Sequence, residues 1–423
     1  MVSPQTPETP SQLSSVPRIP VPRTCPFAPP AEYGRLRDTA PVTRAQLPGG
    51  QEVWAVSTFT DVRSLLVRPD VSSDPRRPGF PEPFPDAPTE EPGATEGPAD
   101  PEEEAPLPQL FEMDPPQHTR YRRMLIPELT VKRVNELRPG IQQLVDRLID
   151  DMLATGPETD LVPAFALPIP SMVICQLLGV AYDSHEFFQS RTEIVLSKTV
   201  TAEQRETAYL ELYAFLDEVV SATESDPTDD ILGRLVVKYR RTDELSHEML
   251  VNTAVLLLLA GHETSANTIA LGVLTFLEHP GQLRILLTEP AAAVSAADEM
   301  VRFHSLGDVD ISRVATADFT LGGQTIHAGE GILPILSAAN RDPQAFERPD
   351  EFDIRRPDSR HHVGFGYGPH QCLGQNLARA ELEIAYRTLF TRIPSLRLAV
   401  PVDELDFKTD SQIFGLRSLP VTW

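Results

Sequence analysis

Long stretches of the chain place apolar residues three and four positions apart, which is the spacing of one face of an α-helix. The pattern is clearest at 137–154, 208–222 and 248–277. It predicts that most of the chain after residue 114 is helical. The last of these stretches is apolar on almost every side, so we expect a helix in the centre of the core.

Strand patterns are short and few. Residues 51–58 alternate between apolar and polar positions, and 319–336 holds short apolar runs with glycines at the turns. Two more short β patterns, at 395–401 and 418–423, close the chain. Helices and strands do not alternate as βαβ units, so the fold class is mainly α with a minor β region and one core.

Two regions lack the apolar content that a packed core needs. Residues 1–24 are rich in Pro, Ser and Thr, and we expect a disordered tail there. Residues 81–105 hold nine Asp or Glu and no Lys or Arg. This stretch predicts a long acidic mobile loop at about 74–108, either a solvated loop or a lid. The remainder, 25–423, is predicted to be a single domain.

Composition narrows the class of protein. The 423 residues carry a formal charge of −24, which disfavours a nucleic-acid partner. Three cysteines, Cys25, Cys175 and Cys372, argue against a disulfide framework. The start of the chain has no signal-peptide pattern, and no apolar run approaches the length of a membrane span. We therefore expect a cytoplasmic protein without a membrane partner.

The third cysteine stands in an unusual loop. The sequence FGYGPHQCLG, residues 365–374, sets Cys372 among three glycines directly before a strong helical pattern. Alone, the cysteine could simply be a small residue packed in a turn. Its place before a helix start, however, favours a thiolate, because backbone N–H groups and the helix dipole stabilise an anion there. No second Cys or His has zinc spacing, so a single thiolate ligand indicates a metal already held by other bonds, as in haem.

The loop resembles the haem-binding loop of the cytochrome P450 monooxygenases. The fixed positions of the pattern F-G-x-G-x-H-x-C-x-G are all matched, by Phe365, Gly366, Gly368, His370, Cys372 and Gly374. The resemblance implies the cytochrome P450 fold, haem b (iron protoporphyrin IX) as cofactor, and Cys372 as the axial ligand of the iron. It extends over nearly the whole chain and is closest to the soluble actinobacterial branch.

A second motif lies inside the long apolar pattern. Ala260, Gly261, Glu263 and Thr264 match the A-G-x-[DE]-T of the family's oxygen-binding groove. A glycine within a helix costs about 1 kcal/mol relative to Ala, so Gly261 needs a reason, which is either a close helix crossing or space above the haem. By resemblance, Ala260 and Gly261 leave room for dioxygen, and Thr264 with Glu263 handles protons.

The pair Glu299 and Arg302 has the spacing E-x-x-R on a predicted helix. Such pairs are mostly surface ion pairs. In this order along the chain it resembles the family's buried Glu–Arg pair, which a further basic residue completes. Arg355 or Arg356 could be that residue, and the sequence leaves the choice open.

Haem carries two carboxylates that need donors. His118 and Arg122 are four residues apart and share a helix face. By resemblance these two bind a propionate, and Arg313 and His370 match the other propionate contacts. A solvated basic helix is the alternative for the first two.

The resemblance also implies partners and a pocket. Electrons would come from NAD(P)H through a reductase and a ferredoxin, docked near Arg120, Arg123, Lys132 and Arg379. The predicted pocket lining is Leu256, Leu257, Ala260, Val309, Ile311 and Phe414. Asp308 and Asp310 either meet a polar substrate group or face solvent in a turn.

The function expected from these motifs is a monomeric haem-thiolate monooxygenase. It would hydroxylate a hydrophobic small molecule, either a secondary metabolite such as a macrolide or other polyketide, or a xenobiotic. Epoxidation, dealkylation or oxidative coupling with the same haem is the enzymatic alternative. A haem-based sensor or carrier is the other class, and an intact acid–alcohol pair, Glu263 with Thr264, argues against it.

Overall fold

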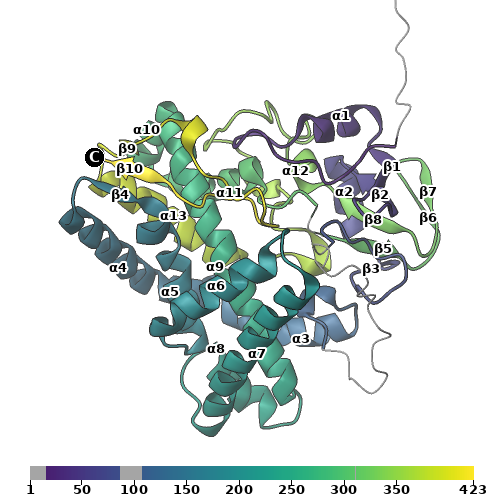
Figure 1. The fold of residues 1–423 in the computed structure, drawn as a ribbon, viewed down its shortest axis with the longest axis horizontal. Helices are drawn as coiled ribbons and strands as arrows, with labels where there is room; N and C mark the ends of the chain where they lie inside the picture. The colour runs from purple at the N-terminus through teal and green to yellow at the C-terminus, as the bar shows by residue number, and fades with distance from the viewer. Residues whose placement is uncertain (1–15, 86–106, 310) are drawn as a thin grey trace, which may run out of the picture.

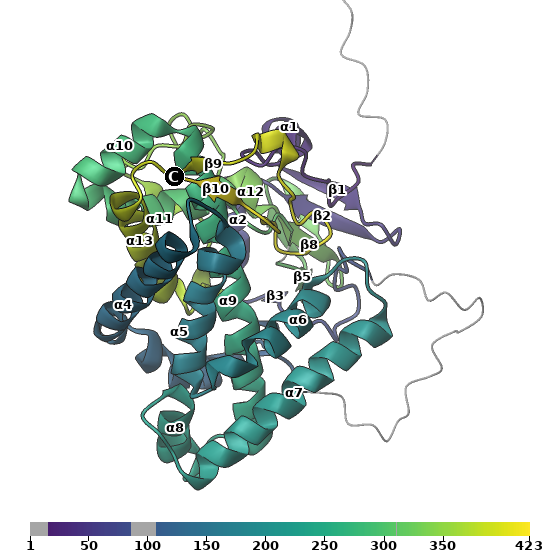
Figure 2. The same cartoon turned by 60° about the vertical axis from the view of Figure 1, so that its left-hand side comes forward.

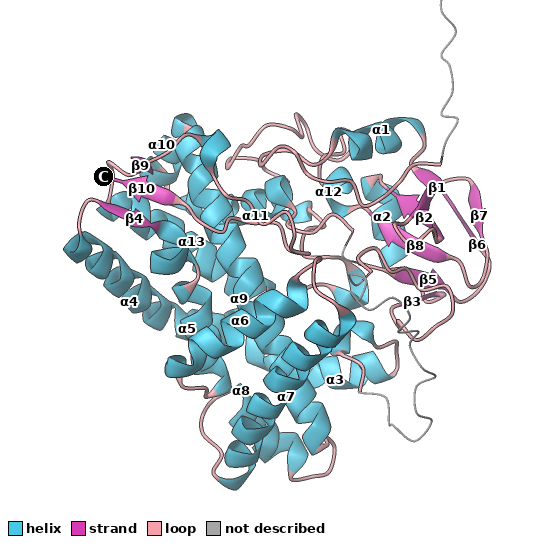
Figure 3. Ribbon diagram, viewed as in Figure 1, coloured by secondary structure: helices cyan, strands magenta, loops and turns pink. Residues whose placement is uncertain are grey.

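A computed structural model describes residues 16–85, 107–309 and 311–423. Its helical part and its main sheet lie at opposite ends of the molecule (Figures 1 and 2). Helices dominate and strands are short, as Figure 3 shows by colour. The predicted fold class is confirmed.

The described α-helices of five residues or more have the following bounds: α1 Ala31–Thr39, α2 Phe59–Leu66, α3 Gln117–Leu125, α4 Val131–Thr155, α5 Pro168–Leu178, α6 His185–Leu196, α7 Ala202–Ser225, α8 Ile231–Leu235, α9 His247–Glu278, α10 Pro280–Thr288, α11 Pro290–His304 and α13 Gln375–Arg392. Shorter helical turns include α12 Leu336–Ala339 and a 3₁₀ turn at Gly368–His370.

Helix α9 is the central element. Its 32 residues make a rod about 48 Å long. Ser246 caps its start by accepting a hydrogen bond from the Met249 amide at 3.1 Å, and Pro280 begins the next helix. Helices α5, α7 and α13 pack around it. By length and mean hydropathy α9 could cross a membrane, contrary to the expectation that no stretch could, but 72% of its most apolar window is buried inside the protein.

The sheets are small. Five strands pair in the order β1 (Val42–Gln46), β2 (Glu52–Val56), β8 (Gly331–Pro334), β5 (Arg313–Ala315), β3 (Val71–Ser72), and only β2 with β8 is parallel. Strands β4 (Glu158–Asp160), β10 (Pro420–Thr422) and β9 (Arg397–Leu398) form a second sheet, and β6 (Phe319–Leu321) pairs with β7 (Gln324–Ile326). The buried apolar residues form one large helical cluster and two smaller ones at the five-stranded sheet.

The predicted tail ends earlier than residue 24. Ile19 is 1% exposed, and its amide donates to the Gln46 carbonyl at 3.0 Å. Arg23 is bound to Asp308 at 2.8 Å. The prolines of this segment remove backbone donors but leave apolar surface to bury, which composition alone undervalued. Residues 1–15 and the acidic stretch 86–106 lie outside the described residues, so the expectations of a tail and a mobile loop stay predictions there.

Candidate active site

An inner cavity lies between the middle of α9 and the cysteine loop. The groups that face it come from α9, from the segment after α11, and from the loop and helix around Cys372. The residues that bear on the argument are Ala260, Gly261, Thr264, Leu306, Ile311, Phe365, His370, Cys372, Glu381 and Ile413. Two motifs more than 100 positions apart in the sequence therefore face one space.

The cysteine loop is folded back on itself. The Cys372 amide donates to the Phe365 carbonyl at 2.7 Å, which closes the loop. Gly366 and Gly368 adopt φ of +69° and +74°, a region that favours glycine. A Cβ on Gly368 would lie 2.8 Å from the Leu66 carbonyl oxygen of α2, so the loop also packs too closely there for any side chain.

Opposing effects act on the Cys372 thiol. Burial raises its pKa, and backbone N–H groups of Gly374 and Gln375 and the charges of Arg122 and Arg379 act to lower it. These two amides belong to the start of α13, where the helix dipole favours an anion. Burial has the largest effect, so the pKa of the thiol is raised overall, and a thiolate at this position requires a bound cation.

On the opposite wall, Gly261 has a packing reason. A Cβ there would come within 3.1 Å of Ile174 Cδ1 on α5, so the glycine permits the close α5–α9 crossing. The hydroxyl of Thr264 donates to the Ala260 carbonyl at 2.8 Å, one turn back along α9. Its oxygen keeps acceptor capacity toward the cavity.

Glu263 is not part of the inner cavity wall. Its Oε2 lies 3.0 Å from Lys408 Nζ and 2.9 Å from Asn267 Nδ2, and it borders a small separate cavity with Asp410 and Arg417. Adjacent helix residues point about 100° apart, which explains why Thr264 and Glu263 face different spaces. Burial acts to raise the pKa of Glu263, but Lys408 and His262 outweigh it, so the pKa is lowered and the group is ionised.

Four predicted donors gather at one edge of the inner cavity. His118 and His370 stack with ring centroids 4.0 Å apart, and Arg122 on α3 donates to the Gln371 carbonyl. Arg313 is 8% exposed. Burial, and then the neighbouring positive charges, lower the pKa of His118 to about 4 and that of His370 to about 3. Burial lowers the pKa of Arg313 to about 10.

The protein satisfies this basic cluster only in part. Nδ1 of His118 and Nδ1 of His370 are buried without a hydrogen-bond partner among the described residues. Within the same part of the chain, neither Arg122 nor Arg313 forms an ion pair of 4.0 Å or less. A buried dianionic edge, such as the two propionates of haem, would supply the missing acceptors. The residues present therefore fit haem b.

Comparison with known proteins decides the family. The family model described as Cytochrome P450 matches residues 196–394. Cytochrome P450 105A3 of Streptomyces carbophilus is 44% identical over 408 residues, which cover 96% of each chain. The chain belongs to the cytochrome P450 family.

Solved P450 structures agree over the same length. The mycinamicin VIII C21 methyl hydroxylase MycCI of Micromonospora griseorubida superimposes with a TM-score of 0.87 at 42% identity, covering 96% of this chain and all of that one. P450 MoxA of Nonomuraea recticatena gives 0.85 at 47% identity, covering 96% and 98%. The enzyme is thus a P450 monooxygenase, and membership of the family implies haem and an external supply of electrons.

The E-x-x-R pair is buried, and its third partner is Arg356. Arg302 Nε lies 2.7 Å from Glu299 Oε2, both side chains are fully buried, and Arg356 Nε lies 3.1 Å from the same oxygen. Arg355 instead pairs with Glu289 on the surface. The alternative that the sequence left open is therefore decided by which of two adjacent arginines points inward.

The predicted pocket lining is only partly right. Ala260 and Ile311 line the inner cavity. Leu256 borders a small separate cavity with Tyr121 and Asn252, and Leu257 packs against the main core. These two leucines lie on the same side of α9 as Ala260 and Gly261 but one turn nearer the start of the helix, so the periodicity of the helix could not reveal where the cavity ends.

Val309 and Phe414 line a neighbouring space, called here the outer pocket. Its 17 lining residues are Pro20, Val21, Pro22, Arg23, Pro48, Pro83, Phe84, Pro85, Lys198, Leu306, Asp308, Val309, Lys408, Thr409, Ser411, Gln412 and Phe414. Asp308 does not face solvent in a turn, because Arg23 binds it and its side chain is 15% exposed. Asp310 lies outside the described residues.

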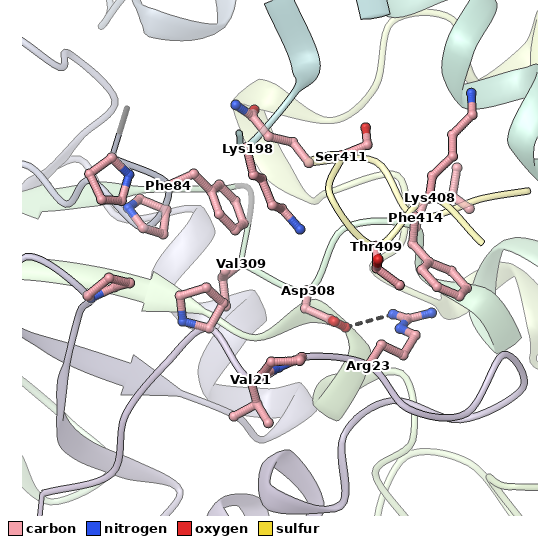
Figure 4. Close-up of a pocket in the computed structure, with 17 residues that line it drawn as sticks. Val21, Arg23, Phe84, Lys198, Asp308, Val309, Lys408, Thr409, Ser411 and Phe414 are labelled. Atoms are coloured by element: carbon pink, nitrogen blue, oxygen red, sulfur yellow. Dashed lines mark hydrogen bonds and ion pairs between the residues drawn. The ribbon is translucent and has the colours of Figure 1, made fainter. Parts of the chain in front are cut away.

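Two functional candidates escaped the sequence reasoning. Lys408, the partner of Glu263, is 145 positions away in the sequence and stands in no motif. Lys198, which projects into the outer pocket, lies in an irregular segment between α6 and α7 (Figure 4). One signal could have found both, because the whole chain has only four lysines, Lys132, Lys198, Lys238 and Lys408.

Proposed function

We propose that this P450 hydroxylates a mid-sized hydrophobic molecule, a secondary metabolite of the macrolide or polyketide kind or a xenobiotic of similar size. The observation that carries the proposal is a cavity that brings Cys372, Thr264 and an acceptor-poor basic cluster together. The relatives include a mycinamicin VIII C21 methyl hydroxylase and a 20-oxo-5-O-mycaminosyltylactone 23-monooxygenase. Their names support a macrolide-sized substrate.

The proposed roles divide around the inner cavity. Cys372 would be the axial thiolate ligand, and His118, Arg122, Arg313 and His370 would hold the propionates. Haem, when bound by a thiolate, supplies the redox chemistry that activates dioxygen. The apolar lining from Leu306, Ile311 and Ile413 would exclude water and orient the substrate.

Proton handling would be split between two faces of α9. Thr264 is proposed to orient a water molecule in the inner cavity and to pass on a proton, which requires its hydroxyl to release the Ala260 carbonyl. Glu263, ionised and bound by Lys408, would collect protons on the other face. Exchange between the two faces needs a movement of Lys408 or of the Glu263 side chain.

Electron delivery is proposed to come from NAD(P)H through a reductase and an acidic ferredoxin. Arg120, Arg123 and Lys132 are exposed on α3 and α4 and suit an acidic partner. Arg379 is a poorer choice for a docking test, because its Nε is bound to the buried Asp298 at 2.7 Å. Changing Arg120, Arg123 and Lys132 to Glu should slow reduction by ferredoxin and leave substrate affinity unchanged. An unchanged reduction rate would remove this face from the proposal.

The decisive experiment is the Soret spectrum of the reduced, carbon monoxide-treated protein. A strongly red-shifted band is expected for an intact thiolate ligand, and Cys372→Ser should lose both the band and turnover. A band typical of histidine ligation in the unaltered protein would contradict the axial assignment. A cytoplasmic, monomeric enzyme remains part of the proposal, with gel filtration of the purified protein as its check.

A further inference from the structure

One irregular segment forms part of the wall of both cavities. Residues 304–307 line the inner cavity, and Leu306 with residues 308–309 lines the outer pocket, a cavity of about 390 Å³. Leu306 is the member of this segment that borders both spaces. The conformation of residues 304–309, called here the wall segment, therefore affects the space that a substrate finds on either side.

The wall segment begins with a strained turn. Ser305 ends α11 at φ +42°, in the left-handed region that residues other than glycine rarely adopt. Such a conformation persists only where its surroundings hold it. The Ser305 hydroxyl accepts a hydrogen bond from Asn340 Nδ2 at 2.8 Å, and the Ser305 carbonyl accepts one from Arg23 Nη2 at 3.0 Å. Arg23 comes from the irregular N-terminal segment, 282 positions earlier in the sequence.

Arg23 holds the wall segment at further points. Its Nη1 donates to the His304 carbonyl at 3.0 Å, and its Nη2 also donates to Asp308 Oδ1 at 2.8 Å. The Arg23 side chain is only 5% exposed. Because a guanidinium is planar and its donors form a rigid fork, partners on both sides of Leu306 are kept at a fixed spacing.

The same guanidinium contacts a second wall. It lies 4.6 Å from the centre of the Phe414 ring, which is a cation–π distance, and Figure 4 shows this ring beside the pair of Arg23 and Asp308. Phe414 lines the outer pocket, and its neighbour Ile413 lines the inner cavity. The Phe414 amide donates to the Leu306 carbonyl at 3.0 Å. Arg23 therefore contacts both walls at the place where the two cavities adjoin.

We propose that Arg23 determines specificity by fixing Leu306 and Phe414, and with them the connection between the inner cavity and the outer pocket. An elongated apolar substrate uses both spaces, whereas a short one uses the inner cavity alone. Walls that are ordered before the ligand arrives lower the entropic cost of binding the longer molecule. Arg23 is thus a positioning residue that acts through its neighbours. This inference rests on the proposed function, since it concerns the selection of substrates for that site.

The alternative is that Arg23 only attaches the N-terminal segment to the rest of the protein. Arg37 on α1 offers a matched control, because its Nη1 donates to the carbonyls of Ala338 at 3.3 Å and Arg341 at 2.6 Å. Among the described residues that line the two cavities, none of these three appears. Removing either arginine should lower the melting temperature, but only the removal of Arg23 should alter the choice of ligand.

The first test measures amide hydrogen exchange in the haem-loaded protein by mass spectrometry. The Phe414 amide reports on the contact between the two walls. Arg23→Met removes the charge and the donors, and peptides that contain residues 305–309 or Phe414 should then exchange at least about tenfold faster. Arg37→Met should speed exchange near residues 338–341 and leave the wall peptides unchanged. Unchanged exchange of the wall peptides in Arg23→Met, or equal acceleration in Arg37→Met, would overturn the inference.

The second test compares N-butylimidazole with N-dodecylimidazole, which bind haem iron through the same ring and differ only in the length of the tail. Spectral titration measures both affinities. Arg23→Met should weaken binding of the dodecyl compound by about tenfold and change that of the butyl compound by less than about twofold. Arg23→Lys keeps a charge for Asp308 but lacks the planar fork, so its loss should be intermediate. Arg37→Met should keep the ratio of the two affinities.

An unchanged ratio of affinities in Arg23→Met would reject the proposed role even if the melting temperature fell, because such a fall alone indicates attachment of the N-terminal segment. If Arg23→Met does not fold, the same ratio measured in Arg23→Lys decides between the two interpretations. Failure of the proposed function would appear separately, as the absence of the red-shifted carbon monoxide band in the unaltered protein.

Discussion

Two buried clusters of basic residues differ in whether the protein itself satisfies them. In the cluster of Arg302, Glu299 and Arg356, all five N–H donors of Arg302 are used, on Glu299 at 2.7 and 2.9 Å and on the carbonyls of Asn340, Pro349 and Glu351. In the basic cluster at the inner cavity, Arg313 makes one side-chain hydrogen bond to the described residues, to the Ser312 carbonyl at 2.7 Å. Both arginines are buried.

This difference distinguishes buried charges that the protein itself pairs from buried charges whose partners a ligand would supply. Burying a charged group without partners is costly, so a cluster left incomplete by the chain points to something that completes it. Arg302 and Arg356 hold the segment after α12 against α11. His370 instead lines the inner cavity, and His118 and Arg122 lie beside it with buried Arg313 as a further neighbouring charge, an arrangement that fits an anionic cofactor edge.

Removing the acid of the complete cluster should have the largest effect. Glu299→Gln leaves Arg302 and Arg356 buried without a counter-charge, and the free energy of unfolding should fall by about 3–5 kcal/mol. Urea denaturation followed by circular dichroism measures this loss. Glu289→Gln, which removes the acid of the surface pair with Arg355, is the matched control and should leave the denaturation midpoint in place. If both variants lost a comparable free energy of unfolding, the buried cluster would contribute no more to stability than the surface pair.

In the incomplete cluster, removing a basic residue should act on the cofactor rather than on the chain. Arg313→Gln deletes one charge-assisted hydrogen-bond donor to a carboxylate, worth about 1.5–3 kcal/mol. Haem should therefore transfer to an acceptor protein at least about tenfold faster. The haem-free variant should be as stable as the unaltered haem-free protein, or more stable, because a buried unpaired charge is gone. A loss of stability without haem would make Arg313 a structural residue.

The stability of the protein should depend on pH more steeply without haem than with haem bound at the basic cluster. The folded-state pKa values of His118 and His370, about 4 and about 3, lie below the unfolded value near 6.5. The unfolded chain therefore binds more protons, and stability is lost as pH falls from 6.5 toward 4, by at most about 1.4 kcal/mol per pH unit for each histidine. Haem carboxylates would raise these pKa values and flatten the loss. Urea titrations at pH 7 and pH 5 should show a steeper decline without haem than with it.

The smallest effect is expected at Arg355. Its pair with Glu289 is exposed, and exposed pairs contribute little. Arg355→Ala should leave the melting temperature unchanged, whereas Arg356→Ala should lower it by several degrees, because the donors to Glu299 and to three carbonyls are lost. Similar melting temperatures for the two variants would show that the pairing of Arg356 with Glu299 contributes no more to stability than the surface pair of Arg355.

The sequence predicted what is local or carried by a fixed motif. The periodicity over 248–277 predicted α9, and the loop motif predicted that Cys372 precedes a helix. Contacts between distant residues were out of reach. The choice between Arg355 and Arg356 depends on the course of an irregular segment, and the pairing of Lys408 with Glu263 joins residues 145 positions apart. The pocket prediction failed at Leu256 and Leu257 because periodicity identifies a helix face but gives no sign of how far along that face the cavity extends.

The outer pocket is assembled almost entirely from irregular segments: the stretch around Arg23, the turn at Pro48, residues 83–85, Lys198, residues 306–309 and residues 408–414. The basic cluster and Cys372 stand instead on α3, on β5 and in the short cysteine loop that leads into α13. The outer pocket and the groups proposed to hold the cofactor are thereby placed on separate parts of the chain. Substitutions in the segments that line the outer pocket can therefore change its shape and polarity without moving Cys372 or the basic cluster.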